Sequence, residues 1–130
     1  MRILIIDDDG FVRSVAAALL TARGHECEGA PAAMEGSARA QSEPFDVVLI
    51  DMVMPGLHGL EAVKEIAHII PPIPVIAMSA GSPSTPPEDF EVLALRMGAS
   101  AFLAKPFNST QLMQAIATAK PPAICAPSAQ

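Results

Sequence analysis

The chain of 130 residues has the length of a single domain, and 51% of its residues are apolar, a composition typical of globular rather than disordered proteins. Its formal net charge of −6 argues against a nucleic-acid-binding surface, which would be basic. The chain has no apolar run near the ~20 residues of a membrane span and does not open with a signal-peptide pattern, so we expect no membrane contact.

Short continuous apolar runs recur along the chain and predict β-strands that are buried on both faces, as in a parallel sheet. In chain order, these runs are Ile3–Ile6, His25–Gly29, Val47–Ile50, Val75–Met78 and Ala101–Leu103. The second run is the most polar of them. We therefore expect it to lie near an edge of the sheet.

Apolar residues recur at helical spacing between and after these runs, with Gly24 and Gly98 as expected helix ends and Asn108 or Ser109 as the expected start of the last helix. The helical stripes begin near Val12, Ala32, Leu60, Phe90 and Leu112. Strand and helix thus alternate five times, which predicts an α/β fold with a doubly wound five-stranded parallel sheet and five helices. The Pro- and Ala-rich residues 121–130 predict a flexible tail.

Polar residues follow four of the predicted strands. Asp7 and Asp8 end the first, Asp51 the third and Ser79 the fourth, while Lys105 follows the fifth. In open α/β sheets, ligands bind outside the carboxyl ends of the strands, so these five side chains are expected to converge. Each residue alone has a structural explanation as a turn residue, a helix cap or a solvated lysine, and it is their convergence that indicates a site.

The residue types indicate the chemistry of this predicted site. Clustered carboxylates repel one another, and a cation such as Mg²⁺, which prefers hard oxygen ligands, would offset that repulsion. A hydroxyl and an ammonium group suit the oxygens of a phosphoryl group, and one carboxylate can act as a nucleophile. The sequence therefore predicts a Mg²⁺-dependent phosphoryl site.

Four segments, ILIIDDD, VVLIDMVMPGLHGLE, VIAMSA and GASAFLAKPF, resemble the successive signatures of the receiver domain of bacterial two-component response regulators. The resemblance covers residues 2 to about 119 and assigns residues 1–120 to a receiver domain. It implies a flavodoxin-like (βα)5 fold and a cytoplasmic phosphoprotein. Such a domain accepts a phosphoryl group from a sensor histidine kinase or a histidine phosphotransfer protein, and it catalyses only its own phosphorylation and slow dephosphorylation.

The resemblance also implies roles for single residues. Asp51 is the phosphoacceptor. Asp7 and Asp8, with Asp51 and the backbone carbonyl of Val53, hold Mg²⁺; Asp8 is the direct ligand of the acidic pair, and Asp7 acts largely through water. No other cofactor is implied.

Three further positions match the family pattern. Ser79 and Lys105 contact the phosphoryl group, and the bond from Lys105 to Pro106 is cis. Ser79 and Phe102 form a switch that alters the face made by the fourth helix, fifth strand and fifth helix. A downstream protein or an output domain reads that face, without direct nucleic-acid contact.

The chain departs from the family pattern at three places. Gly10 is unusual so close to a helix start, and Asp9 before it is interpreted as a surface charge or N-cap rather than a ligand. The segment from Ser79 to Lys105 is longer than usual by a few residues, and the excess is Pro-rich. The Pro-rich piece, Gly81–Asp89, either is an inert insertion or tunes partner choice. No output domain follows, so a single-domain regulator and a piece of a larger protein both remain open.

Two other functions compete with the receiver hypothesis. A Mg²⁺-dependent phosphohydrolase of haloacid dehalogenase type also uses a strand-end Asp nucleophile, but it carries a second acid two residues later, where this chain has Val53. A phosphorylation-independent interaction module would have a vestigial site. The cysteines Cys27 and Cys125 fit no metal-ligand spacing, and we expect free thiols in a reducing compartment. The histidines likewise show no ligand spacing.

Overall fold

The computed structural model describes residues 1–53, 59–69, 72–81 and 84–119. Its centre is a five-stranded sheet in the order β2-β1-β3-β4-β5, in which every neighbouring pair is parallel. The strands are β1 (Arg2–Ile6), β2 (Glu26–Ala30), β3 (Val47–Asp51), β4 (Val75–Ser79) and β5 (Ala101–Ala104). The predicted fold class is confirmed, and the polar second strand lies at an edge as expected.

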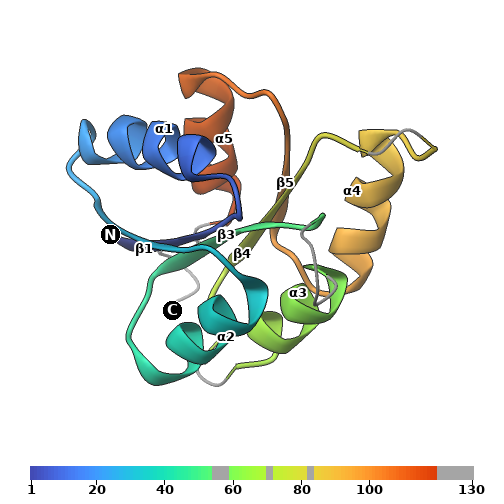
Figure 1. Ribbon diagram of the computed structural model, residues 1–130, viewed down its shortest axis with the longest axis horizontal. Coiled ribbons are helices and arrows are strands. Elements are labelled where there is room, and N and C mark those ends of the chain that lie inside the picture. Colours follow the sequence, from blue (N-terminus) through green and yellow to red (C-terminus); the bar gives the residue numbers. More distant parts are fainter. Residues whose placement is uncertain (54–58, 70–71, 82–83, 120–130) are drawn as a thin grey trace, which may run out of the picture.

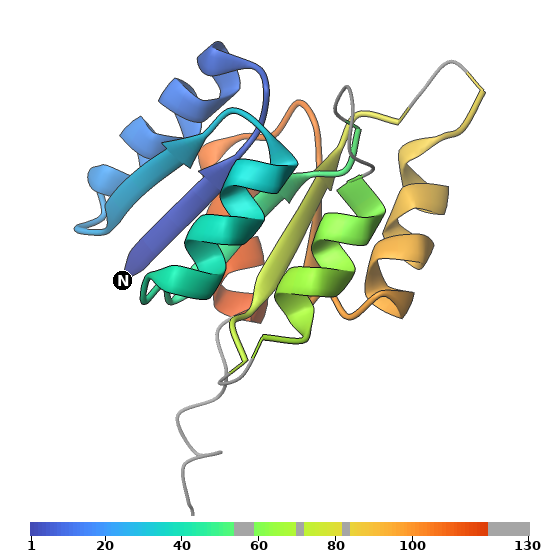
Figure 2. The same cartoon turned by 60° about the horizontal axis from the view of Figure 1, so that its bottom comes forward.

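The helices cover both faces of this sheet (Figures 1 and 2). They are α1 (Gly10–Thr21), α2 (Ala33–Ser42), α3 (Gly59–Ala67), α4 (Pro87–Arg96) and α5 (Ser109–Ala119). Figure 1 shows α1 and α5 on one face, with α2, α3 and α4 on the other. From β1 the chain adds β2 on one side of the sheet, and then β3, β4 and β5 on the other side. In this class of fold, ligands bind at the point between β1 and β3 where the strand order changes sides.

Two aliphatic cores result from the alternation of side chains along each strand. In β1, Leu4 and Ile6 join the core under α2, α3 and α4, while Ile3 and Ile5 join the core under α1 and α5. All four side chains are essentially inaccessible to solvent. A Cβ atom on Gly36 of α2 would overlap the Ile6 side chain, so the absence of a side chain there lets α2 lie close to the sheet.

The predicted ends of the helices agree with the structure where residues are described. Gly24 and Gly98 have φ values of 87° and 110° just after α1 and α4, a conformation that glycine adopts without strain. Asn108 caps α5, because its Oδ1 accepts a hydrogen bond from the Gln111 N–H at 2.8 Å. The predictions for His58, Cys125 and the tail 121–130 lie outside the described residues.

A charged cluster lies at the end of the sheet opposite the carboxyl ends of the strands. The guanidinium groups of Arg2 and Arg39 lie 4.3 Å and 5.8 Å from the centre of the Phe45 ring. Glu43 joins both arginines, with distances of 2.9 Å to Arg2 Nη2 and 2.9 Å to Arg39 Nε. The hydrogen bonds from Arg39 and Arg2 lower the pKa of the Glu43 carboxyl from 4.5 to about 2.

Replacing Glu43 with glutamine is therefore expected to cost stability in a pH-dependent way. Because the folded state lowers the pKa, the contribution is present above the unfolded value of 4.5 and is lost as the pH falls towards about 2. In urea unfolding, the difference in the free energy of unfolding between wild type and Glu43→Gln should be largest near neutral pH. It should decrease as the pH falls from 4.5 towards about 2. Glu26→Gln, at an exposed residue of β2, is the control. A gap that stays constant down to acidic pH would contradict the expectation.

Candidate functional site

Four neighbouring strands of the sheet end in the polar side chains that the sequence singled out. Asp51 and Ser79 are the last residues of β3 and β4, Asp7 directly follows β1, and Lys105 directly follows β5. A backbone hydrogen bond from the Lys105 N–H to the Ser79 carbonyl, 3.0 Å long, joins the last two strand ends. The Lys105–Pro106 bond is cis, as the family resemblance implied.

Three carboxylates meet at this edge. Single oxygens of Asp7, Asp8 and Asp51 lie within 4.8 Å of one another. Asp7 and Asp51 are 0% and 5% exposed, whereas Asp8 lies at the solvent side of the cluster. These donors are all hard oxygens, and an exposed acid next to two buried ones leaves room for water ligands. The cluster fits Mg²⁺, which commonly binds one or two carboxylates and keeps several waters.

Hydrogen bonds fix the two buried carboxylates in similar ways. Asp7 Oδ1 accepts from the Asp9 N–H at 2.9 Å, and Asp51 Oδ1 accepts from the Val53 N–H at 3.0 Å. The second oxygen of each faces Lys105, whose Nζ lies 2.9 Å from Asp7 Oδ2 and 3.3 Å from Asp51 Oδ2. Lys105 thus bridges two carboxylates that would otherwise face each other with no positive charge between them.

The electrostatics follow from this arrangement. Burial raises the pKa of Asp51 and the charge of Asp7 adds to the rise, whereas the Val53 N–H and Lys105 oppose it. Burial by itself would lower the pKa of Lys105, but Asp7 and Asp51 together outweigh it and raise that pKa. The lysine therefore stays protonated at neutral pH and keeps a positive charge beside the carboxylates.

Ser79 is fully buried, and its hydroxyl oxygen accepts a hydrogen bond from the Gly81 N–H at 2.9 Å. Gly81 has a φ of 81°, and a Cβ there would come within 2.8 Å of the Thr85 carbonyl oxygen. The serine hydroxyl is thus tied to the loop that follows β4. Phe102 is a half-buried residue of β5, and its side chain lies on the face of the sheet that α4 covers.

A family model described as the response regulator receiver domain matches residues 3–117. The chain belongs to this family. The receiver domain is 31% identical over 116 residues to the chemotaxis protein CheY of Thermotoga maritima, and the match covers 88% of this chain and 93% of that protein. It is 35% identical over 117 residues to the protein PilH of Pseudomonas aeruginosa, covering 88% and 93%. Its match to the transcriptional regulatory protein CpxR homolog of Haemophilus influenzae is 34% identical over 116 residues and covers 88% of this chain but 48% of that protein.

Solved structures agree with this assignment. The receiver domain of a CheY-like protein from Methanospirillum hungatei superposes with a TM-score of 0.79 at 30% identity, covering 89% of this chain and 90% of that one. CheY4 of Vibrio cholerae gives a TM-score of 0.77 at 30% identity, covering 89% and 95%. The chain is therefore a signalling module of two-component systems, and the phosphohydrolase alternative is not favoured. None of its described helices has the length and apolar character needed to cross a membrane.

Two features of the receiver domain were not predicted from the sequence. Asp9 is the N-cap of α1 and accepts from the Phe11 N–H at 2.9 Å, as expected, but this turn leaves Phe11 itself 76% exposed beside the site. Arg13 folds back from α1, and its Nη1 donates to the backbone carbonyl of Asp7 at 2.6 Å. No spacing pattern in the sequence indicates this second contact.

Proposed function

We propose that this receiver domain accepts a phosphoryl group on Asp51 from the phosphohistidine of a sensor histidine kinase or a histidine phosphotransfer protein. The observation that carries the proposal is the environment of the Asp51 carboxylate. It is buried at a strand end, held by the Val53 N–H through one oxygen, and faced by Lys105 at 3.3 Å through the other. The labelling experiments in the Discussion test it.

The transfer consists of one bond formed and one broken. A carboxylate oxygen of Asp51 forms an O–P bond while the P–N bond to the donor imidazole breaks, and the electron pair of that bond returns to the nitrogen. The Lys105 ammonium, already within reach of Asp51, neutralises charge on the transferred oxygens. Later attack of water on the phosphorus releases phosphate and restores the carboxylate, so dephosphorylation completes the cycle.

Asp7, Asp8 and Asp51, together with the Val53 carbonyl, are the groups proposed to hold Mg²⁺. Bound there, the ion supplies positive charge to the phosphoryl oxygens. Asp8 is the most informative of these groups for a test. It is exposed, so its substitution removes a ligand without leaving a cavity in the core.

Mg²⁺ is expected to raise the melting temperature of the unphosphorylated wild type, because it binds the folded state. Asp8→Asn should weaken that effect, shifting the Mg²⁺ concentration for half-maximal stabilisation upwards roughly tenfold or more. In EDTA, Asp8→Asn should melt no lower than wild type, since it relieves carboxylate repulsion. Asp9→Asn keeps an N-cap for α1 and is the control. Equal Mg²⁺ responses in wild type and Asp8→Asn would contradict the metal role.

Ser79 and Phe102 are proposed to carry the signal away from the site. Phosphorylation adds almost two negative charges, which provides a new acceptor for the Ser79 hydroxyl. If the hydroxyl turns towards it, the Gly81 N–H loses the partner it has at 2.9 Å, and the loop after β4 must adjust. The start of the Pro-rich segment is thereby linked directly to the site, although residues 82 and 83 lie outside the described residues.

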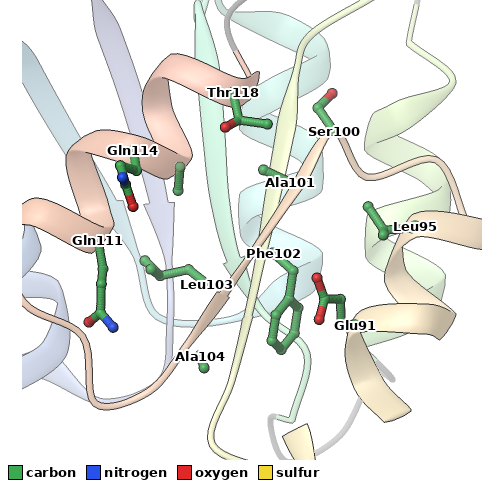
Figure 3. A pocket seen from close by; sticks show the side chains of 11 residues that line it. Glu91, Leu95, Ser100, Ala101, Phe102, Leu103, Ala104, Gln111, Gln114 and Thr118 are labelled. Atoms are coloured by element: carbon green, nitrogen blue, oxygen red, sulfur yellow. The ribbon is translucent and has the colours of Figure 1, made fainter. Parts of the chain in front are cut away.

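The proposed output surface is the face made by α4, β5 and α5, where a pocket of about 440 Å³ opens between the two helices (Figure 3). Phe102 and Leu103 of β5 form its floor, Leu95 lines the α4 side, and Gln114 lines the α5 side. Leu95 is 47% exposed, so the α4 side of the pocket presents apolar surface. Because Phe102 lies in this pocket, its movement would change the surface that a downstream partner meets.

Hydrogen exchange can test this route. Acetyl phosphate with Mg²⁺ is expected to change the exchange of amides in β5 and at the start of α4 in wild type. Ser79→Ala should still be labelled, yet most of that change should be lost, because the hydroxyl that links the phosphoryl group to the loop is gone. Ser100→Ala, in the pocket but outside the phosphoryl site, should behave like wild type. An unaltered response in Ser79→Ala would count against the switch.

A further inference from the structure

The side chain of Arg13 reaches from the first turn of α1 back to the loop that carries the acids. Its Nη1 donates to the backbone carbonyl of Asp7 at 2.6 Å, while the Arg13 N–H bonds to the Asp9 carbonyl at 3.1 Å within the helix. The Asp7 carbonyl belongs to the peptide unit that joins Asp7 to Asp8. Because a peptide unit is planar, a hydrogen bond that fixes its oxygen also fixes the start of Asp8.

The hydrogen bond from Arg13 to the Asp7 carbonyl affects the position of the Asp8 side chain more than that of the Asp7 side chain. Asp7 is held independently, by its N–H bond to the Ala30 carbonyl at 3.1 Å and by its carboxylate contacts with Asp9 and Lys105. Asp8 is exposed and depends on the backbone for its direction into the cluster. A group that anchors the Asp7–Asp8 peptide therefore acts chiefly on the position of the Asp8 carboxylate.

Gly29, on the neighbouring strand β2, leaves space for the Arg13 side chain. A Cβ on Gly29 of β2 would be 3.3 Å from Arg13 Cδ, and a Cβ on Gly10 would be 3.4 Å from Arg13 Nη2. Among the residues that the structure describes, positive φ values occur at Gly24, Gly81 and Gly98. Backbone conformation therefore does not require Gly10 or Gly29. At Gly29 a Cβ atom would crowd the Arg13 side chain, whereas at Gly10 it would make only an ordinary contact with it.

We propose that Arg13 is a positioning residue for the metal site: it fixes the Asp7–Asp8 peptide so that Asp8 presents its carboxylate to Mg²⁺. The inference rests on the proposed function, since it assumes that the acid cluster binds the ion. It makes a prediction opposite in sign to that of simple electrostatics. Removal of a positive charge near a cation site should strengthen Mg²⁺ binding, whereas loss of a positioning contact should weaken it.

The test measures Mg²⁺ affinity of the unphosphorylated protein from the Mg²⁺ dependence of its melting temperature. Arg13→Met keeps the aliphatic stem and should raise the apparent Kd roughly tenfold, as loss of groups that orient metal ligands commonly does. The labelling rate by acetyl phosphate at saturating Mg²⁺ should stay near wild type. Arg13→Lys, which retains a donor, should recover part of the affinity. Arg23→Met removes the same charge just after α1 ends and should leave the Kd unchanged.

A substitution at Gly29 tests the same contact of Arg13 with the Asp7 carbonyl without changing Arg13 itself. Gly29→Val should displace the Arg13 side chain while keeping its charge, so it should also weaken Mg²⁺ binding. The double variant Arg13→Met/Gly29→Val should bind Mg²⁺ no more weakly than the weaker-binding single variant. An unchanged or lower Kd in Arg13→Met, with wild type binding normally, would overturn the inference and leave the proposed function intact. No Mg²⁺ response in wild type would overturn the metal site and the inference together.

Discussion

Asp51→Asn is expected to lose Mg²⁺-dependent phosphorylation to the background level, with acetyl phosphate and with a phosphorylated kinase alike. An amide is a poor nucleophile and cannot form the acyl phosphate, whereas every other group of the site remains in place. The measurement is the incorporation of acid-labile phosphoryl groups over time. Asp9→Asn is the matched control, because it makes the same chemical change two residues from Asp7 and preserves a residue type that caps α1.

The same variant should also be more stable than wild type in the absence of Mg²⁺. The Asp51 carboxylate is 5% exposed and lies beside Asp7, so burial and repulsion both oppose its ionised form. We expect a gain of about 0.5–2 kcal/mol in the free energy of unfolding. Labelling of Asp51→Asn at a rate near that of wild type would refute the assignment of the phosphoacceptor, and a loss of labelling accompanied by unfolding would show that the asparagine disrupts the fold instead.

Lys105→Met is expected to affect both the chemistry and the metal-free protein. Its Nζ is the cation that joins Asp7 and Asp51, at 2.9 Å and 3.3 Å. Without it, two buried carboxylates face each other, and a cost of about 3 kcal/mol is typical when one partner of a buried pair is removed. Labelling by acetyl phosphate should slow roughly a hundredfold, the usual effect of losing one charge-stabilising donor.

Mg²⁺ provides the internal check on this prediction. The ion would replace part of the missing positive charge, so the melting temperature of Lys105→Met should be low in EDTA and should rise with Mg²⁺ by more than that of wild type. Lys64→Met, at an exposed lysine of α3, is the control and should match wild type in both respects. A Lys105→Met protein with wild-type stability in EDTA and a wild-type labelling rate would contradict the role of the bridge.

The sequence predicted the fold and the convergence of the site because both depend on regular spacing. Buried parallel strands appear as continuous apolar runs, and the residue after such a run must lie at the carboxyl edge of the sheet. Asp7, Asp51, Ser79 and Lys105 could therefore be placed together without any knowledge of side-chain conformation. The structure brings the side chains of Asp7, Asp51 and Lys105 into contact at this edge and places Ser79 at the end of the strand between β3 and β5.

Contacts that depend on side-chain direction were not predictable in this way. The bond from Arg13 to the Asp7 carbonyl requires a long side chain to turn back along its own helix, and no periodicity encodes that turn. The packing of Arg2 against Phe45 likewise joins residues far apart in the chain. The hydrogen bond that the Ser79 hydroxyl accepts from the Gly81 N–H was also not predictable. That partner depends on the path of the loop and not on residue type.

The most direct test of the central claim is to locate the phosphoryl group itself. Wild-type protein is incubated with acetyl phosphate and Mg²⁺, the acyl phosphate is trapped by borohydride reduction, and the modified residue is identified by mass spectrometry of peptides. We expect one modification, at Asp51, that requires Mg²⁺ and is absent from Asp51→Asn. Modification at Asp7 or Asp8 instead, or no Mg²⁺-dependent modification at all, would contradict the assignment of Asp51 as the phosphoacceptor.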